Sequence, residues 1–88
     1  MPRCTVYFKP SADKQLAKLP RDVQRRIVAA VDALAGDPRP QGVAKIAGDD
    51  NLWRIRTGDY RVAYEIHDDR LVVLVLRVAH RGDLYRGL

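Results

Sequence analysis

The sequence lacks the residues from which several kinds of site are built. Cys4 is the one cysteine among the 88 residues, so the chain cannot form an internal disulfide. A catalytic cysteine needs a neighbouring base that the sequence does not supply, and we interpret Cys4 as a small strand or core residue. His67 precedes Asp68 and Asp69, but this spacing is more typical of a polar turn than of a metal site. We therefore expect no bound metal.

Long hydrophobic runs are also missing. No apolar segment reaches the roughly 20 residues that a membrane span requires. The first ten residues, MPRCTVYFKP, contain no hydrophobic core of a signal peptide. Repeats, low-complexity segments and long linkers are absent, and the length suits one small domain over residues 1–88. These features predict a cytoplasmic protein with no membrane association.

Positive charge is what the chain has in excess. Lysine and arginine number 16 against 11 aspartate and glutamate residues, and the formal net charge is +5. Such a charge favours a polyanionic partner, most commonly nucleic acid. Arginine outnumbers lysine, which base composition of a coding sequence can also cause. The position of each arginine is therefore more informative than the number.

Residues 52–66, read as LWRIRTGDYRVAYEI, predict a β-hairpin. Two alternating runs of branched and aromatic residues flank Gly58-Asp59, and a glycine at the first central position suits a two-residue type II′ turn. This turn places Thr57 opposite Tyr60 and fixes the register of every other pair. Directly opposed residues share a face, so the hairpin has one apolar and one basic side. The apolar side comprises Trp53, Ile55, Val62 and Tyr64, and the basic side comprises Arg54, Arg56 and Arg61.

The basic side of the hairpin has two interpretations. Arg56 and Arg61 are directly opposed, which is destabilising for like charges. The pair can be a solvated strand face with splayed side chains. It can also be an anion site, because a phosphate that accepts bidentate arginine contacts turns the repulsion into binding.

The segment before the hairpin predicts two helices. Residues 3–8 form a first strand, and Pro10 suits the first turn of a short helix that Pro20 ends. The apolar stripe of Val23, Ile27, Val31 and Leu34, widened by Ala30, predicts a second helix over residues 21–35. Gly36 suits its C-terminal cap. Its arginines, Arg21, Arg25 and Arg26, form a solvated face or contact an RNA backbone.

The remaining segments complete a sheet. Residues 43–47 predict a short edge strand with Lys45 pointing outward. Residues 71–78, LVVLVLRV, form an almost continuous apolar run that is typical of a strand covered on both faces. The order β-α-α-β-β-β, with one possible extra strand, indicates an α+β fold in which a helical hairpin packs on one face of a small, mainly antiparallel sheet. On the open face, the hairpin arginines are joined by Arg77 or Arg81.

Three segments together resemble the RelE/ParE superfamily of toxins from bacterial toxin–antitoxin pairs. They are LPRDVQRRIVAAVDALAGDP, the hairpin LWRIRTGDYRVAYEI and the terminal VLVLRVAHRGDLYR. The match spans almost the whole chain, and the hairpin and the terminal segment are its most specific parts. Within the superfamily the sequence looks like the RelE side. The resemblance implies a ribosome-dependent mRNA endonuclease that needs no metal and no cofactor. In that reaction the ribose 2′-OH attacks the adjacent phosphorus and leaves a 2′,3′-cyclic phosphate.

The resemblance also implies partners and site residues. The partners are the ribosome with its mRNA and a cognate antitoxin, an acidic and partly disordered chain, in a complex that forms higher oligomers. Arg54 and Arg56 match two basic positions that are usually lysines, and Arg61 matches the arginine at the scissile phosphate. Arg81 matches the arginine after the last core strand, and Tyr85 matches a tyrosine that stacks on a base. Lys45 and Arg77 would add contacts to the RNA backbone.

This sequence departs from the family pattern at the general base. An arginine holds a phosphate but is a poor base, so Arg54 and Arg56 leave that role unfilled. His80 is the leading candidate, because imidazoles titrate near neutrality. A backbone-bonded His80 and a Tyr85 that packs on the core remain alternatives. Glu65, the one glutamate, is either an ion-pair partner of an arginine or a base.

Two other functions remain open at this point. A ParE-type toxin shares the fold but inhibits DNA gyrase without cutting RNA. A non-catalytic module that binds RNA or an antitoxin would use the same basic face. The set of Arg54, Arg56, Arg61, His80, Arg81 and Tyr85 favours the RelE-type nuclease.

Overall fold

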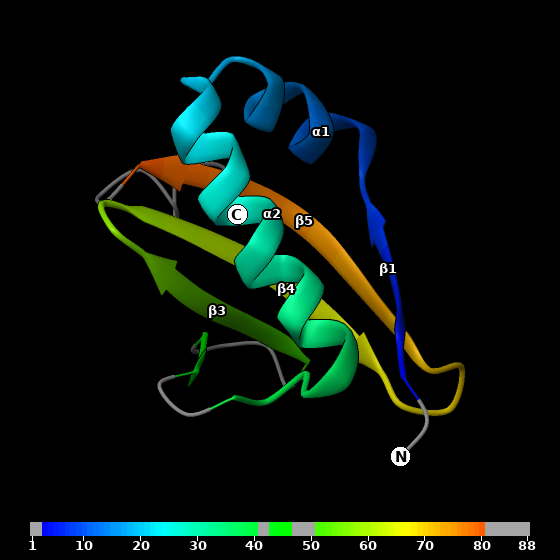
Figure 1. Ribbon diagram of the computed structural model, residues 1–88. Helices are drawn as coiled ribbons and strands as arrows, with labels where there is room; N and C mark the ends of the chain where they lie inside the picture. Colours follow the sequence, from blue (N-terminus) through cyan, green and yellow to red (C-terminus); the bar gives the residue numbers. More distant parts are fainter. Residues whose placement is uncertain (1–2, 41–42, 47–50, 81–88) are drawn as a thin grey trace.

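A computed structural model describes residues 3–40, 43–46 and 51–80 (Figure 1). Its element order agrees with the predicted order and includes the extra short strand. In chain order the elements are β1 (Thr5–Phe8), α1 (Pro10–Ala17), α2 (Arg21–Gly36), β2 (Ala44–Lys45), β3 (Leu52–Thr57), β4 (Tyr60–His67) and β5 (Val72–His80).

The strands form one sheet in the order β1-β5-β4-β3-β2. β1 pairs in parallel with β5, and all other neighbouring strands are antiparallel. α1 and α2 cross the same face of this sheet (Figure 1). The predicted α+β class, with a helical hairpin on one face of a mainly antiparallel sheet, is therefore confirmed.

The hairpin of β3 and β4 has the predicted register. Thr57 pairs with Tyr60 and Arg56 with Arg61, and the pairing continues to Leu52 opposite Glu65. Gly58 has a φ of +59°, the left-handed region that the first central residue of a type II′ turn requires. The turn chemistry thus sets which side chains share each face.

Proline residues mark the helix ends. Pro10 is the first residue of α1, where its missing N–H costs nothing. α2 ends because Pro38 restricts Asp37, which has extended backbone angles and is the C-cap residue. The prediction that Gly36 is the cap was wrong, since Gly36 is the last helical residue.

The main core lies between the helices and the sheet. The stripe residues Ile27, Val31 and Leu34 of α2 are each at most 1% exposed. They pack against the hairpin's apolar side and against β5. The buried sheet residues of this cluster are Ile55, Val62, Tyr64, Ile66, Val73, Val75 and Val78.

A β-bulge in β5 decides which residues reach each face. Tyr64 pairs with Val75 but Ala63 pairs with Arg77, so Leu76 is an extra residue on β5. Val75 and Val78 consequently both belong to the core on the helix side. Arg77 is placed on the opposite, open face beside Ala63. Within the part of the chain that the structure describes, no helix is long and apolar enough to cross a membrane.

Candidate nucleic-acid interface

Two rows of residues run across three strands on the open face of the sheet. Arg54 of β3 pairs with Ala63 of β4, which pairs with Arg77 of β5. In the next row, Arg56 pairs with Arg61, which pairs with Ala79. Because paired residues share a face, the structure brings Arg54, Arg56, Arg61 and Arg77 to one side of the sheet, as the sequence predicted.

Two alanines separate these arginines. Ala63 is fully buried, and Ala79 packs on the small cluster that Ala63 forms with Ile46 and Leu52. An alanine side chain ends at Cβ, so the longer arginine side chains extend past it. The arginines therefore lie beside a small buried apolar cluster on this face of the sheet.

The hairpin arginines lack acidic partners in the described part of the chain. The ion pairs that arginines form there join Arg26 to Asp22, Arg39 to Asp68 and Arg70 to Asp69, and none includes an arginine of the hairpin. Arg61 Nη1 donates hydrogen bonds to the main-chain carbonyls of Tyr60 at 3.2 Å and Gly58 at 3.5 Å. Arg54, Arg56 and Arg61 therefore form a cluster of like charge that a bound anion would stabilise.

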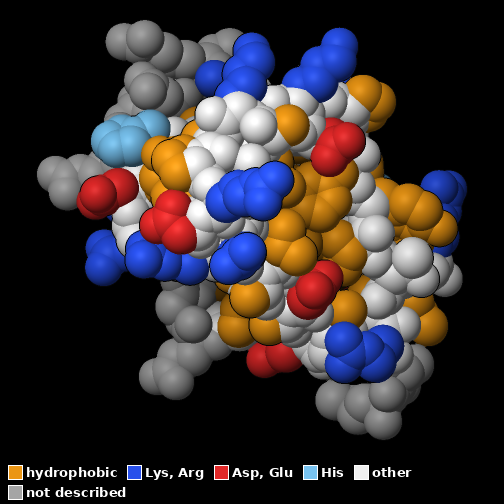
Figure 2. All heavy atoms as spheres, turned by 45° about the horizontal axis from the view of Figure 1, so that its top comes forward, with side chains coloured by type: hydrophobic (Ala, Val, Ile, Leu, Met, Phe, Trp, Pro, Cys, Tyr) orange, Lys and Arg blue, Asp and Glu red, His pale blue; other side chains and the backbone are white. Residues whose placement is uncertain are grey.

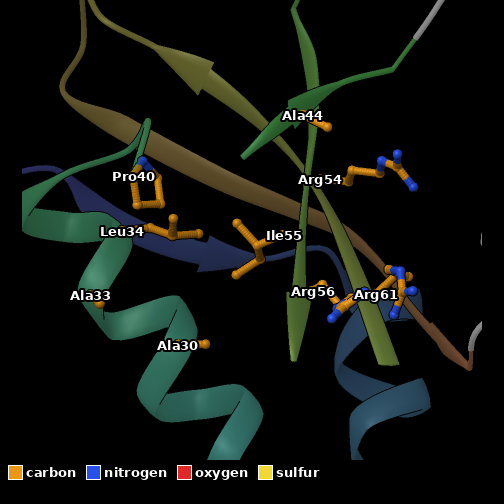
Figure 3. Close-up of a pocket in the computed structure, with 9 residues that line it drawn as sticks. All are labelled: Ala30, Ala33, Leu34, Pro40, Ala44, Arg54, Ile55, Arg56 and Arg61. Carbon is orange, nitrogen blue, oxygen red and sulfur yellow. The ribbon is translucent and has the colours of Figure 1, made fainter. Parts of the chain in front are cut away.

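A hollow of about 620 Å³ adjoins the hairpin arginines (Figure 3). It extends around β3 to the space between this strand and α2. Arg54, Arg56 and Arg61 lie at one end of the hollow, and Leu34 and Ile55 line the other. The hollow thus combines a basic part with an apolar part.

His80 lies on the other side of the sheet from these arginines. It is the last residue of β5 and pairs with Tyr60. Tyr60 lies two residues from the core residue Val62 and therefore faces the same, helix-covered side of the sheet. The two rings meet edge to face, with centroids 5.3 Å apart and an interplanar angle of 88°. Gln15 of α1 supports this end of β5, because its Oε1 accepts a hydrogen bond from Val78 N–H at 2.8 Å. The imidazole is exposed but is not in the arginine rows.

Two further candidates also lie apart from the arginines. Lys45 pairs with Trp53, and its Nζ lies 5.6 Å from the centroid of the indole ring, on the helix side of the sheet. Glu65 shares the open face but contacts His67, with 3.1 Å between Oε1 and Nε2. The structure therefore gives Glu65 a histidine partner in place of an arginine. Arg81 and Tyr85 lie outside the described residues.

One polar contact near Trp53 had no signal in the sequence. Arg39 binds the carboxylate of Asp68 through two hydrogen bonds of 2.9 and 3.2 Å. Its guanidinium also lies 5.2 Å from the centroid of the Trp53 ring. The hydrogen bond from Arg39 lowers the pKa of Asp68. This contact ties the segment after α2 to the turn between β4 and β5.

The exposed surface of the helices carries charges of both signs. Lys and Arg side chains are interspersed there with Asp and Glu side chains, and hydrophobic side chains appear between them (Figure 2). Arg26 and Asp22 are 3.9 Å apart, with both side chains more than two-thirds exposed. This arrangement agrees with the interpretation of the α2 arginines as a solvated face. Among the described residues, no three His, Cys, Asp or Glu side chains gather in a way that could hold a metal ion.

Comparison with known proteins gives one consistent result. Residues 6–85 match the model of a family described as ParE toxin of type II toxin–antitoxin system, parDE. Toxin RelG of Mycobacterium tuberculosis is 38% identical over 89 residues, covering 93% of this chain and 95% of that protein. Toxin RelE3 of Methanocaldococcus jannaschii is 29% identical, covering 91% and 93%.

Two solved structures with the same fold are toxin–antitoxin complexes. The RelBE2 complex of Mycobacterium tuberculosis contains a chain with a TM-score of 0.80 and 30% identity, covering 90% of this chain and 99% of that one. The RelE–RelB complex of Pyrococcus horikoshii contains a chain with a TM-score of 0.80 and 32% identity, covering 93% and 98%.

Proposed function

The chain belongs to the ParE toxin family of type II toxin–antitoxin systems, and from its similarity to the RelG and RelE3 toxins we propose that it is a RelE-type endoribonuclease that cuts mRNA on the ribosome. The observation that carries this proposal is the cluster of Arg54, Arg56 and Arg61 on the open face. Three guanidinium groups without acidic partners in the described part of the chain suit a phosphodiester backbone.

In this mechanism the arginines stabilise charge on the scissile phosphate. Arg61, together with Arg81, holds the equatorial oxygens, on which negative charge builds as the 2′-OH attacks phosphorus. Arg54, Arg56 and Arg77 hold the flanking backbone, and Lys45 adds a contact beyond the edge of β3. The P–O bond to the leaving 5′-oxygen then breaks, and the product is a 2′,3′-cyclic phosphate with no metal in the reaction.

In this proposal His80 is the residue that transfers a proton. The reaction needs a group that takes the 2′-OH proton or returns one to the 5′-oxygen, and arginines are unsuited to that task. His80 is exposed at the end of β5, next in sequence to Ala79 of the arginine row. An RNA strand that passes Arg61 and turns around the end of β5 would reach the imidazole, and Tyr85 would stack on a base of this strand.

The ribosome and an antitoxin are the proposed partners. A catalytic set divided between two sides of the sheet needs a substrate held in a bent path, which a ribosome can impose on mRNA. Two relatives with solved structures come from RelBE2 and RelE–RelB complexes, and we extend that partnership to this chain, with higher oligomers of the complex as a further part of the proposal. The site of action would then be the cytoplasm.

Mapping of cut sites in a translating extract tests the nuclease. Wild-type protein should produce new mRNA 5′ ends within codons at the decoding site, detected by primer extension, and none without ribosomes. Arg61→Ala should cut about 10²–10³ times more slowly. Arg70→Ala is the matched control, since Arg70 is an exposed arginine in the turn between β4 and β5 that pairs with Asp69. An equal loss of cleavage rate in both variants, or cleavage by Arg61→Ala at the wild-type rate, would contradict the assignment of Arg61 to the scissile phosphate.

The family description also supports a second candidate. The matching family is named for ParE of parDE systems, and a ParE-type toxin inhibits DNA gyrase without cutting RNA. An intact message in the extract together with inhibited supercoiling by gyrase would establish this alternative. An intact message with unaffected gyrase would leave a non-catalytic binding module.

A further inference from the structure

The outer surface of α2 presents a stripe of side chains on the side of the helix that is turned away from the sheet. The stripe borders a shallow hollow of about 480 Å³. Its members belong to α2 alone and recur every three or four residues, so they share one face of the helix. They are Arg21, Gln24, Arg25, Val28, Ala29 and Asp32. This stripe is therefore a surface of α2 that another molecule can reach.

The middle of the stripe is apolar. Val28 is 40% exposed, although a branched aliphatic side chain is more stable when it is removed from water. Ala29 beside it is also exposed. Its small side chain lets a second helix come close, because the distance between packed helices depends on the side chains at the contact. The middle of the stripe thus suits contact with another helix.

Opposite charges lie on the two sides of this apolar middle. Arg25 and Asp32 are seven residues apart, and the midpoint between them falls between Val28 and Ala29. Each charge is therefore about one helical turn, or about 5 Å along the helix axis, from the midpoint. Both side chains are exposed, and the ion pairs in the described part of the chain include neither of them.

This arrangement is complementary to itself. In a two-fold symmetric contact, a residue i that meets residue j of the other copy is matched by j meeting i. Two antiparallel α2 helices that cross at the midpoint place Arg25 of each copy against Asp32 of the other. Val28 of each copy then packs on Ala29 of the other. Arg21 comes near the C-terminal end of the other helix, where the helix dipole favours a cation.

We propose that the occupant of this stripe is a second copy of the chain, in an antiparallel α2–α2 dimer with two reciprocal ion pairs between Arg25 and Asp32. A polyanion such as RNA fits the stripe less well, because Asp32 repels it. Since α1 and α2 cover one face of the sheet (Figure 1), the dimer leaves the hairpin arginines on the open face accessible in both copies. The dimer does not rest on the proposed nuclease function.

Sedimentation equilibrium of the purified full chain is the first test. The contact of one helix pair is small for a protein interface, and the net charge of +5 on each copy opposes association. We therefore expect a reversible dimer that forms at about 0.1–1 mM protein. A protein that stays monomeric up to about 1 mM would overturn the proposal.

A charge reversal at Arg25 tests the ion pairs. Arg25→Asp places two carboxylates together at each end of the contact, and dimerisation should weaken at least about tenfold. Arg26→Asp is the matched control, because Arg26 is an exposed neighbour outside the stripe whose guanidinium lies near Asp22. Both variants lower the net charge by the same amount, which by itself favours association. Equal dimerisation of the two variants would reject the contact between Arg25 and Asp32.

A mixture of two variants makes the test specific to a two-fold contact. Asp32→Arg places two arginines together at each end, so it should also dimerise at least about tenfold more weakly than the wild type. In an equal mixture of Arg25→Asp and Asp32→Arg, each new side chain faces an opposite charge on the other protein. A heterodimer should then form at concentrations where neither variant associates alone. Two folded variants that fail to associate in the mixture would contradict the antiparallel register.

A dilution series of the unsubstituted protein keeps the test independent of folding defects. In ¹⁵N-correlation NMR spectra recorded across the same concentrations, the amide signals of Val28 and Ala29 should shift, and those of Arg56 and Arg61 should not. Concentration-dependent shifts confined to β3 and β4 would place the contact between copies on the open face and refute the α2 dimer.

Discussion

Tyr64 is the largest fully buried side chain of the described residues, and its hydroxyl reaches the edge of the core. The O–H donates a hydrogen bond of 2.8 Å to the carbonyl of Pro38, just beyond the end of α2. Burial raises the pKa of Tyr64 strongly, the nearby Arg39 opposes this shift and Asp37 adds to it. Because the phenol stays protonated in the folded chain, the free energy of unfolding changes with pH in the alkaline range.

The Tyr64 hydrogen bond gives a prediction with a defined sign. Tyr64→Phe leaves the Pro38 carbonyl without its donor and should lower the free energy of unfolding by about 1 kcal/mol at neutral pH in urea denaturation. In the wild type, the unfolded chain releases the tyrosine proton near pH 10 while the folded chain retains it. The free energy of unfolding should therefore fall as pH rises above about 10.

The alkaline loss should be smaller in Tyr64→Phe than in the wild type. Tyr7→Phe serves as the control, since Tyr7 is 55% exposed and should leave the alkaline loss unchanged. The same alkaline loss in all three proteins would contradict a buried, protonated Tyr64.

His80 gives a prediction about catalysis at the same scale. If its imidazole transfers a proton in the cleavage step, His80→Ala should slow single-turnover cleavage on the ribosome by about 10²–10⁴ while RNA affinity stays unchanged. His67→Ala is the matched control, because His67 contacts Glu65 at the opposite end of β4. Cleavage by His80→Ala at the wild-type rate would remove the histidine from the mechanism.

At the scale of elements, the hairpin turn depends on one backbone conformation. Gly58 has a φ of +59°, and a Cβ placed there would meet no atom within 4 Å. The cost of Gly58→Ala is therefore conformational, and we expect a loss of about 1–2 kcal/mol in the free energy of unfolding. Thermal and urea denaturation measure this loss.

Gly36→Ala is the opposite case and the control for Gly58→Ala. Gly36 is the last residue of α2, and a Cβ there would approach only the flexible Arg3 side chain, at 3.3 Å from Nη1. Helix propensity then favours alanine by up to about 1 kcal/mol, so this variant should be stabilised. Equal changes in the free energy of unfolding of both variants would contradict a cost that comes from the turn conformation of Gly58.

The hairpin and β5 differ in how much of them the sequence could predict. The hairpin was predictable because strict alternation on both sides of Gly58 permits one register, which also placed Arg56 opposite Arg61. The run LVVLVLRV has no alternation of apolar and polar residues. It therefore does not indicate which residues face the helices, nor that a bulge occurs at Leu76. That bulge brings Arg77 to the open face and His80 to the helix side.

Contacts between distant segments were beyond prediction for a related reason. Arg39 and Asp68 are 29 residues apart, and neither belongs to a local motif. Their pairing follows only once α2 and the turn between β4 and β5 have been brought together by the core. The neighbouring cation–π contact with Trp53 has the same origin. Sequence patterns therefore predicted the arginine cluster within one hairpin but not the polar contact between Arg39 and Asp68.

At the scale of the whole molecule, the net charge of +5 and the local arginine cluster make different predictions for RNA binding. If overall charge dominates, removal of any one arginine should have the same effect. If the cluster binds the backbone, only its members should release counterions. For single-stranded nucleic acid, each neutralised phosphate contributes about −0.7 to the slope of log affinity against log salt.

Two charge-matched variants distinguish these possibilities. Arg56→Gln and Arg25→Gln each remove one positive charge, but Arg56 belongs to the open-face cluster and Arg25 lies on the outer surface of α2. With a single-stranded RNA oligonucleotide in anisotropy titrations across salt concentrations, Arg56→Gln should reduce the magnitude of the slope by about 0.7, and Arg25→Gln should leave it unchanged. Equal slopes for the two variants would mean that RNA binding depends on the net charge of the whole molecule. This result would contradict the open face as the RNA-binding surface.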